Sequence, residues 1–254
     1  MLNQPRRIGL ARAGVAALIP FALALAGCGS ESESAEGALS GEPIEAIAAP
    51  DGAEWVQTSA MTDMGGVRLG NPDAPIKLVE YASHTCPHCA TFAENSAEGI
   101  ENYVNTGVVS YELRNQIHDP IDLTIAMLAR CGDASTFHPL ARQAWQDLGT
   151  IVQTAQADPE ALQAAAQAPE AERFQRIGEV SGLIDWFAAR GISRDQAMQC
   201  LSQPDTAAQI VERSTQQSDE LEVTGTPTFF INGSKLDASS WAEVEGALQR
   251  AGAR

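Results

Sequence analysis

The sequence predicts an α/β fold that is interrupted by an inserted α-helical subdomain. An apolar run at 76–81 precedes a Cys-Pro-His-Cys motif at 86–89, and a helical pattern follows, so the order is strand, Cys-x-x-Cys, helix. Far downstream, Pro227 stands just before a β-rich run that ends in an Asn-Gly turn signal. Between these parts, the region 120–205 is rich in Ala and Gln and has helical periodicity.

The first 27 residues have the pattern of an export signal. Three arginines give a basic start, and the apolar run at 15–26 is too short to span a membrane. The sequence Leu-Ala-Gly-Cys at 25–28 resembles the bacterial lipobox, and this resemblance implies that Cys28 carries a lipid anchor. An ordinary cleaved signal that leaves Cys28 as an odd thiol is the alternative.

The segment 28–53 is predicted to be a flexible acidic tether. It consists mainly of Ser, Glu, Gly, Ala and Pro, with almost no bulky residue. A domain anchored by such a tether would work close to a membrane surface. The folded part is expected to start at residue 54, with a strand at 54–59, a hairpin at 65–70 and a turn at 71–75.

The Cys-Pro-His-Cys motif places Cys86 at the N-terminus of a helix. Unpaired N–H groups and the positive end of the helix dipole favour a thiolate there, and the thiolate is the nucleophile in disulfide exchange. Pro87 fits the first helical turn, where its missing N–H costs nothing. Cys89 shares one side of the helix with apolar residues at three- and four-residue spacings. We therefore expect Cys89 to be buried and Cys86 to be exposed.

Glu80 shares one face of the preceding strand with Ile76 and Leu78, because side chains alternate along a strand. A carboxyl group buried beneath the cysteines would have a raised pKa and could take or return the proton of Cys89. An exposed glutamate at the end of the strand is the alternative interpretation.

Together, the Cys-Pro-His-Cys motif and the sequence Gly-Thr-Pro-Thr-Phe-Phe-Ile-Asn-Gly at 225–233 resemble the DsbA-like thiol-disulfide oxidoreductases of the thioredoxin superfamily. The resemblance runs from about residue 66 to the C-terminus. It implies a thioredoxin fold in two parts, 54–120 and 206–254, with a helical subdomain at 121–205 inserted between them.

The resemblance also implies roles for individual residues. Cys86 matches the attacking cysteine and Cys89 its buried resolving partner, so the redox group is their disulfide and no further cofactor is expected. The other matches are Pro87 and His88, which tune the thiolate, Glu80 as the buried acid, and Pro227 as a cis-proline that faces the disulfide. Thr226 would offer its backbone to an extended client segment. Thr226 also departs from the pattern of the founding oxidases, which carry valine at this position, whereas isomerase-type relatives often carry threonine.

A further strand and seven further helices are expected after the active-site helix. The strand is expected at 108–114, and the helices at 121–129, 135–148, 161–168, 171–190, 194–201, 207–221 and 241–251. Cys131 and Cys200 lie in the insertion. Because Cys86 and Cys89 are the closest pair, we expect a structural disulfide between Cys131 and Cys200. Two free thiols, or a zinc site that uses all four cysteines, are the alternatives.

Composition excludes several other classes of function. The formal net charge of −17 disfavours nucleic-acid binding, and the sequence has no glycine-rich phosphate loop. No metal site is predicted. His84, His118 and His138 are interpreted as loop or packing residues, with a small electrostatic role open for His84.

We therefore predict a periplasmic thiol-disulfide oxidoreductase, a membrane-anchored lipoprotein that introduces disulfides into cysteine-containing exported polypeptides. The resemblance implies a DsbB-like membrane oxidant as its partner. The alternatives are an isomerase or reductase that is kept reduced, a non-catalytic polypeptide-binding module, and a maturation factor for one metalloprotein. No dimerisation segment stands out before residue 66, so a monomer is expected.

Overall fold

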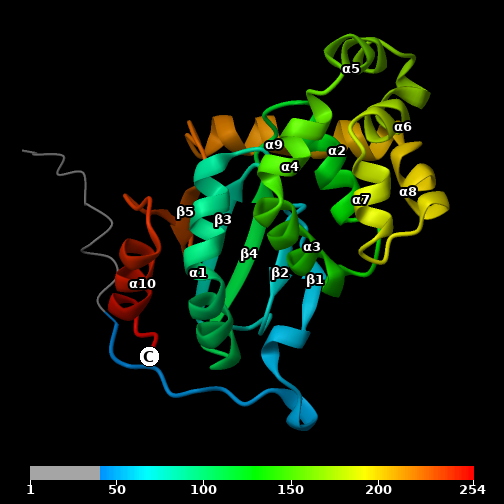
Figure 1. Ribbon diagram of the computed structural model, residues 1–254. Helices are drawn as coiled ribbons and strands as arrows, with labels where there is room; N and C mark the ends of the chain where they lie inside the picture. Colours follow the sequence, from blue (N-terminus) through cyan, green and yellow to red (C-terminus); the bar gives the residue numbers. More distant parts are fainter. Residues whose placement is uncertain (1–40) are drawn as a thin grey trace, which may run out of the picture. The chain divides into compact units, whose positions relative to one another are not determined.

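The structure, a computed structural model, describes residues 41–254. The predicted export signal at 1–27, the lipidation site Cys28 and the first part of the predicted tether lie outside the described residues. The described part confirms the predicted fold class, a thioredoxin-type α/β fold with a helical insertion (Figure 1).

A six-stranded mixed sheet has the strand order β1-β2-β4-β3-β5-β6. The strands are β1 (Ser59–Met61), β2 (Val67–Leu69), β3 (Ile76–Ala82), β4 (Val109–Asn115), β5 (Thr228–Ile231) and β6 (Ser234–Lys235). The central strands β3 and β4 are parallel, and helix α1 (Pro87–Asn105) connects them. Since parallel strands need a long crossover, the order strand, motif, helix in the sequence leads directly to this unit.

The helices cover the sheet and form the insertion. After α1 they are α2 (Pro120–Ala129), α3 (Ala134–Gln146), α4 (Leu148–Ala155), α5 (Pro159–Ala166), α6 (Glu170–Val180), α7 (Leu183–Ala188), α8 (Arg194–Leu201), α9 (Pro204–Glu220) and α10 (Trp241–Arg250). Within residues 41–254, no helix combines the length and the apolar character needed to cross a membrane.

The side chains of β3 alternate between two apolar layers. Ile76 and Leu78 join the main core, to which α1 and α10 contribute. Val79 and Tyr81 point to the other side of the sheet, where they pack with Phe230. Both faces of this central strand are therefore covered, which explains its almost continuous burial.

Helix α1 packs on the sheet through one face. Its buried side chains are Cys89, Phe92, Ser96, Ile100 and Val104. Phe92 contacts Phe229 of β5 with ring centroids 4.4 Å apart, and α10 lies beside α1 (Figure 1). These contacts fix the start of α1, which carries the cysteine motif, to the strand that follows Pro227.

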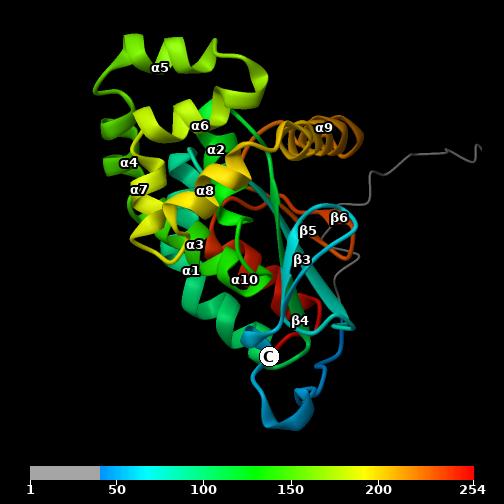
Figure 2. The same cartoon turned by 90° about the vertical axis from the view of Figure 1, so that its right-hand side faces the viewer.

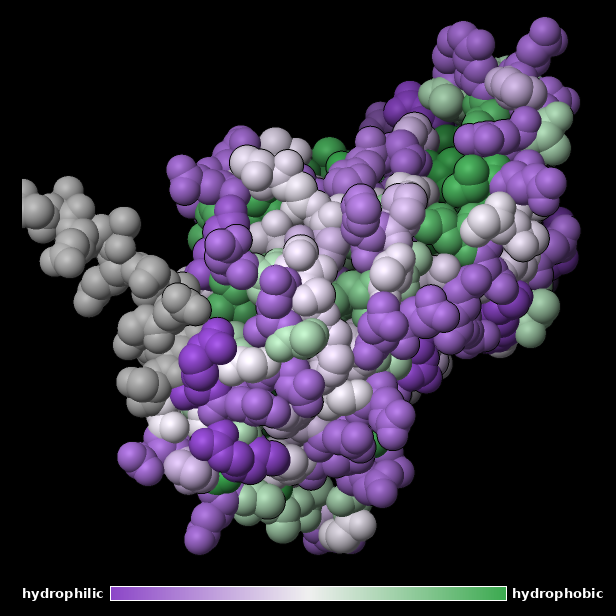
Figure 3. All heavy atoms as spheres, turned by 60° about the vertical axis from the view of Figure 1, so that its left-hand side comes forward, coloured by the Kyte–Doolittle hydropathy of each residue, from purple (hydrophilic) through white to green (hydrophobic). Residues whose placement is uncertain are grey.

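Helices α2 to α8 form the insertion, which extends from the end of the sheet where β3 and β4 finish, while α3 packs against α1, β1 and β2 (Figures 1 and 2). A disulfide between Cys131 and Cys200 joins the end of α2 to α8. The face that Figure 3 shows is largely polar, and its most extended apolar patch lies over the insertion. The insertion and the cysteine motif therefore share one end of the sheet.

Three predicted elements have different limits in the structure. The helix predicted at 171–190 is divided into α6 and α7 at Gly182, whose φ of 72° lies in the left-handed region that glycine adopts without strain. The helix predicted at 135–148 becomes α3 followed by the unpredicted α4. The segment 54–59 is mostly not a strand, because Trp55–Gln57 forms a 3-10 turn.

The tether boundary predicted at residue 53 is wrong, because the chain from Gly41 onward is fixed to the fold. The N–H of Gly41 donates to the Arg250 carbonyl at 2.6 Å, and the N–H of Ile44 donates to the Gly252 carbonyl at 2.9 Å. Ile44 also packs against the main core. Composition alone did not reveal this contact, since backbone hydrogen bonds need no bulky side chains.

Replacing Cys131 and Cys200 by alanine is expected to lower the free energy of unfolding by about 4 kcal/mol. The disulfide links residues that are 69 positions apart, and its removal returns that conformational freedom to the unfolded chain. Urea unfolding of the full chain without reductant measures the loss. A Cys86→Ala, Cys89→Ala variant, which keeps the disulfide, is the control. A loss below about 1 kcal/mol would show that the link constrains little.

Candidate active site

Cys86 caps the N-terminus of α1. Its backbone is extended, with φ −86° and ψ 118°, and its sulfur accepts a hydrogen bond from the Cys89 N–H at 3.4 Å. Pro87 follows in the first helical turn, where its fixed φ suits the helix. The N–H groups and the dipole of this turn therefore stabilise negative charge on the Cys86 sulfur.

The two cysteines differ less in exposure than the sequence predicts. Cys89 is fully buried, but Cys86 is only 6% exposed, so the expectation of an exposed Cys86 is wrong. The reason is the neighbouring Thr226, whose carbonyl oxygen lies 3.4 Å from the Cys86 sulfur. Pro87 and His88 are exposed and provide the surface beside the pair. Both sulfurs are free thiols, so the structure corresponds to the reduced pair.

The Thr226-Pro227 peptide bond is cis and faces the cysteines from the start of β5. Pairing of β5 with β3 puts Thr228 opposite Tyr81. The residues just before β5 therefore lie beside the motif that follows β3. This pairing brings Cys86 and Thr226 together, although they are 140 positions apart in the sequence.

Glu80 is the buried acid of the site. The residue is 1% exposed, and its Oε2 accepts a 2.5 Å hydrogen bond from the Tyr111 hydroxyl. Its Oε1 makes no hydrogen bond with the residues that the structure describes. Burial raises the pKa of Glu80 to about 7, and the bond from Tyr111 opposes this rise only in part. Glu80 can therefore change its protonation state near neutral pH.

Cys89 is held as a thiol. Burial raises the pKa of Cys89 well above its ordinary value, and the negative charge of Glu80 raises this pKa further. Hydrogen bonds from the Ser83 backbone and the Thr226 side chain act in the opposite direction. The pair is therefore asymmetric, because Cys86 lies at a helix N-terminus and Cys89 retains its proton, as nucleophilic attack followed by internal resolution requires.

A polar network centred on Asp122 fixes the loops on both sides of the site. Its carboxylate accepts hydrogen bonds from the backbone N–H groups of His84, at 2.8 Å, and His118, at 2.9 Å. The buried His84 ring stacks on Trp145, whose Nε1 donates to the Ser83 carbonyl. Sequence reasoning did not single out Asp122, because an acidic residue in the first turn of a helix is common for local reasons.

Tyr111 is a second site residue that the sequence analysis did not identify. The alternation along 108–114 gives a signal, since it puts Tyr111 on a buried face, where a tyrosine hydroxyl usually needs a partner. Naming Glu80 as that partner requires the register of β3 on β4, in which Leu78 lies opposite Tyr111. The sequence alone does not provide this register.

Cys131 and Cys200 are bonded to each other and are not available as metal ligands. The alternative of a zinc site that uses all four cysteines is therefore excluded. Among residues 41–254 there is no group of three or more His, Cys, Asp or Glu side chains that could hold a metal ion.

The fold and this site together define a thioredoxin-type protein. The sequence profile of the family described as Thioredoxin matches residues 62–250. The chain belongs to this family, and its fold is DsbA-like.

Solved structures and curated proteins support this classification. The structure of protein-disulfide isomerase from Novosphingobium aromaticivorans has a TM-score of 0.67 and 30% identity, and the match covers 72% of this chain and 94% of that one. Wolbachia pipientis alpha-DsbA1 shares the fold, with a TM-score of 0.55 and 24% identity over 72% of this chain and 88% of that one. A Rickettsia typhi protein named "Putative protein-disulfide oxidoreductase" is 27% identical over 74% of this chain. The chain spans 63% of the length of that relative.

The variant Glu80→Gln is expected to change how stability depends on pH. The folded chain keeps the carboxyl proton up to about pH 7, whereas the unfolded chain loses it near pH 4.5. The neutral carboxyl group of Glu80 therefore contributes to the free energy of unfolding in full below pH 4.5, and this contribution is lost as the pH rises through 7. Relative to Glu80→Gln, the free energy of unfolding of the wild type should fall by about 3 kcal/mol between pH 4.5 and pH 8.

Urea unfolding at both pH values measures this change. Glu98→Gln, which removes an exposed carboxylate from α1, is the control. Its stability should depend on pH as that of the wild type does. A constant difference between the wild type and Glu80→Gln across this range would contradict the raised pKa of Glu80.

Proposed function

We propose that the chain is a thiol-disulfide oxidoreductase that introduces disulfides into exported proteins. The proposal rests on the Cys86 sulfur, which caps a helix and lies 3.4 Å from the carbonyl of Thr226, the residue before the cis-proline. The relatives named protein-disulfide oxidoreductase and protein-disulfide isomerase support the same class of chemistry. The redox group in this proposal is the disulfide that Cys86 and Cys89 form with each other.

The reaction consists of two disulfide exchanges. A client thiolate attacks Cys86, the bond to Cys89 breaks, and Cys89 leaves with the electron pair and takes a proton from Glu80. The second client thiolate then attacks the client sulfur that is bound to Cys86. Cys86 leaves as a thiolate that the Cys89 N–H and the helix dipole stabilise. The client departs with a disulfide, and the enzyme is left as the dithiol.

The client would bind as an extended segment along the backbone at Thr226. Thr226 and Pro227 are half-buried and lie at the start of β5, so part of their backbone is accessible beside the cysteines. Backbone hydrogen bonds of this kind accept many sequences, which suits an enzyme that acts on varied exported polypeptides.

The position of Cys86 at the N-terminus of α1 favours the oxidase direction, because a helix N-terminus favours negative charge and a stabilised reduced form makes a disulfide more oxidising. A disulfide isomerase is the second candidate. Two observations favour it: Thr226 stands where the oxidases that this chain resembles carry valine, and the Novosphingobium aromaticivorans protein is named protein-disulfide isomerase.

The proposed place of action is the periplasm, at a membrane surface. The export signal pattern at 1–27 and the lipobox cysteine Cys28 support a lipoprotein. An oxidising compartment suits the reaction, and a DsbB-like membrane oxidant would regenerate the Cys86-Cys89 disulfide in a monomeric enzyme.

The variant Cys86→Ala is expected to lose thiol-disulfide exchange completely, because it lacks the attacked sulfur. Cys89→Ala is expected to accumulate a mixed disulfide when Cys86 attacks a client disulfide such as that of insulin, because the enzyme then has no second sulfur to release the client. Insulin reduction and non-reducing gels of the full chain measure the two effects. Exchange that survives in Cys86→Ala would rule out the enzyme and leave the polypeptide-binding alternative.

Alkylation of whole cells is expected to trap Cys86 and Cys89 in the oxidised form if the enzyme is an oxidase. A measured reduction potential of roughly −120 mV would agree, whereas a value near about −270 mV is typical of a reductant such as thioredoxin. The Cys131-Cys200 disulfide is an internal control, since it should stay oxidised throughout. A pair found as the dithiol in cells would favour the isomerase or reductase.

A further inference from the structure

Glu80 has to take a proton from solvent whenever its carboxyl group is ionised in the oxidised enzyme, as it is above about pH 7, although its side chain is buried. In the proposed reaction it gives a proton to Cys89 when the client is oxidised and takes one back when the enzyme is reoxidised. Glu80 is 1% exposed and Cys89 is fully buried, so neither group meets bulk water directly. A path for the proton must therefore run through the structure.

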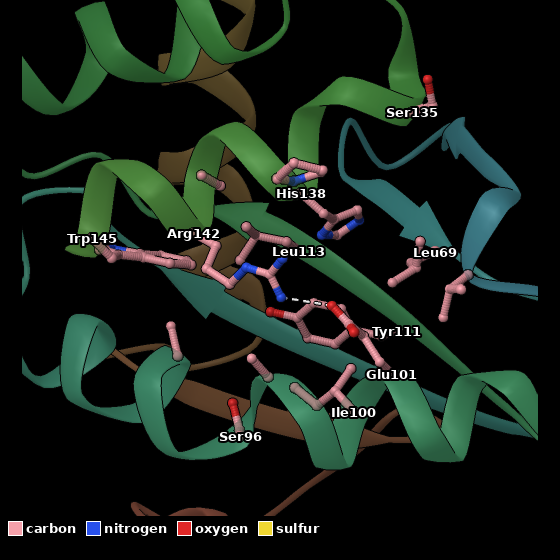
Figure 4. A pocket seen from close by; sticks show the side chains of 15 residues that line it. Leu69, Ser96, Ile100, Glu101, Tyr111, Leu113, Ser135, His138, Arg142 and Trp145 are labelled. Atoms are coloured by element: carbon pink, nitrogen blue, oxygen red, sulfur yellow. Dashed lines mark hydrogen bonds and ion pairs between the residues drawn. The ribbon is translucent and has the colours of Figure 1, made fainter. Parts of the chain in front are cut away.

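A cavity of about 120 Å³ lies between α1, α3 and the sheet (Figure 4). Its lining is mainly apolar and includes Ile100, Leu113 and Trp145. The volume has room for several water molecules. The ion pair of Arg142 with Glu101, at 2.6 Å, also lines the cavity, and both side chains are close to half exposed, at 40% and 47%. The cavity is thus connected to solvent on this side.

Two buried hydroxyl groups line the cavity (Figure 4). Ser96 is 1% exposed, and its Oγ has no hydrogen-bond partner among residues 41–254. A buried hydroxyl of this kind is usually satisfied by water. Tyr111 lines the same cavity, and its hydroxyl donates to Glu80 Oε2 at 2.5 Å. Tyr111 therefore contacts both the cavity and the buried acid.

His138 also lines the cavity, with its ring centroid 5.3 Å from that of Tyr111. Its Nε2 hydrogen bonds to the Val67 carbonyl at 3.0 Å, and burial lowers the pKa of His138 to about 4. The ring is therefore neutral near pH 7 and does not act as the proton donor there. The titratable groups that face Glu80 are then Tyr111 from β4 and Cys89 from α1.

We propose that this cavity is the path by which protons move between solvent and Glu80, with the Tyr111 hydroxyl as the relay. The proposal rests on the proposed function and deepens it, because it assigns a route to the proton that the exchange reaction requires. It makes Tyr111 a positioning and relay residue that acts through Glu80 rather than on the client.

The transfer balances as follows. When the client thiolate opens the Cys86-Cys89 bond, the Cys89 thiolate needs a proton. Below about pH 7 Glu80 already carries this proton, and above pH 7 the Glu80 carboxylate must first receive it and then pass it to Cys89. The Glu80 carboxylate takes the Tyr111 hydroxyl proton at Oε2, while a water molecule in the cavity gives a proton to the Tyr111 oxygen. The water is reprotonated from solvent. Reoxidation of the dithiol reverses each transfer, so above pH 7, where the oxidised enzyme starts and ends with an ionised Glu80, one proton crosses the cavity in each direction per cycle.

The test compares the full chain with Tyr111→Phe, which removes the hydroxyl and keeps the ring. The oxidised enzyme is mixed with dithiothreitol, and loss of the disulfide is followed in H2O and in D2O over a range of pH. Above pH 7, where Glu80 starts as a carboxylate, Tyr111→Phe is expected to slow the reaction roughly tenfold or more and to show a solvent isotope effect that the wild type lacks. The midpoint of its pH profile should move upward, since the bond that lowers the pKa of Glu80 is lost. Tyr103→Phe, which removes a hydroxyl bonded to Glu245, should match the wild type.

A second pair of variants tests the cavity without altering the relay. Ala97 lines the cavity and is half-buried, so Ala97→Leu fills the space and is expected to slow the reaction, while Ala97→Ser leaves it open and should match the wild type. The two Ala97 variants test the proposed proton path even if Tyr111→Phe does not fold. The proposal is overturned if Tyr111→Phe keeps the wild-type rate without an isotope effect, or if the two Ala97 variants react alike. A wild type that does not react with dithiothreitol at all would instead overturn the proposed function, and the proton path with it.

Discussion

The site depends on the antiparallel pairing of β5 with β3. That register, with Thr228 opposite Tyr81, carries the cis peptide bond to the cysteine motif. The same register turns Phe229 toward Phe92 of α1, and a slip of one residue would turn Phe229 to the other side of the sheet. Core packing and the geometry of the redox pair are therefore set by one interaction.

Glu80 is an ionisable residue in an otherwise apolar strand, so its chemistry conflicts with its burial. A carboxyl group in the core costs stability once it is ionised, and β3 would be more stable with an apolar residue at Glu80. The hydrogen bond from Tyr111 satisfies one oxygen and leaves Oε1 without a partner in the described chain. Conflicts of this kind are expected at functional sites, where the chemistry of the residue outweighs its cost to the fold.

Much of the fold and the chemical centre of the site follow from sequence patterns. The alternation in β3 and the spacing in α1 predict that Glu80 and Cys89 point into the core, and both are buried. The covering of Cys86 by Thr226 does not follow, because it depends on a contact across 140 positions. The Tyr111 partner likewise depends on strand register. Local patterns thus give faces and element types, whereas long-range pairing decides which side chains meet.

The helical insertion contributes to the buried half of the redox pair. Asp122 of α2 holds the loops before α1 and after β4, and Trp145 of α3 supports Ser83, whose backbone hydrogen bonds toward Cys89. Arg142 of the same helix closes one side of the cavity beside Glu101. Because α2 and α3 come from the insertion while Glu80 and Tyr111 come from the sheet, the environment of Cys89 is assembled from both parts of the fold. The insertion therefore shapes the environment of the resolving cysteine.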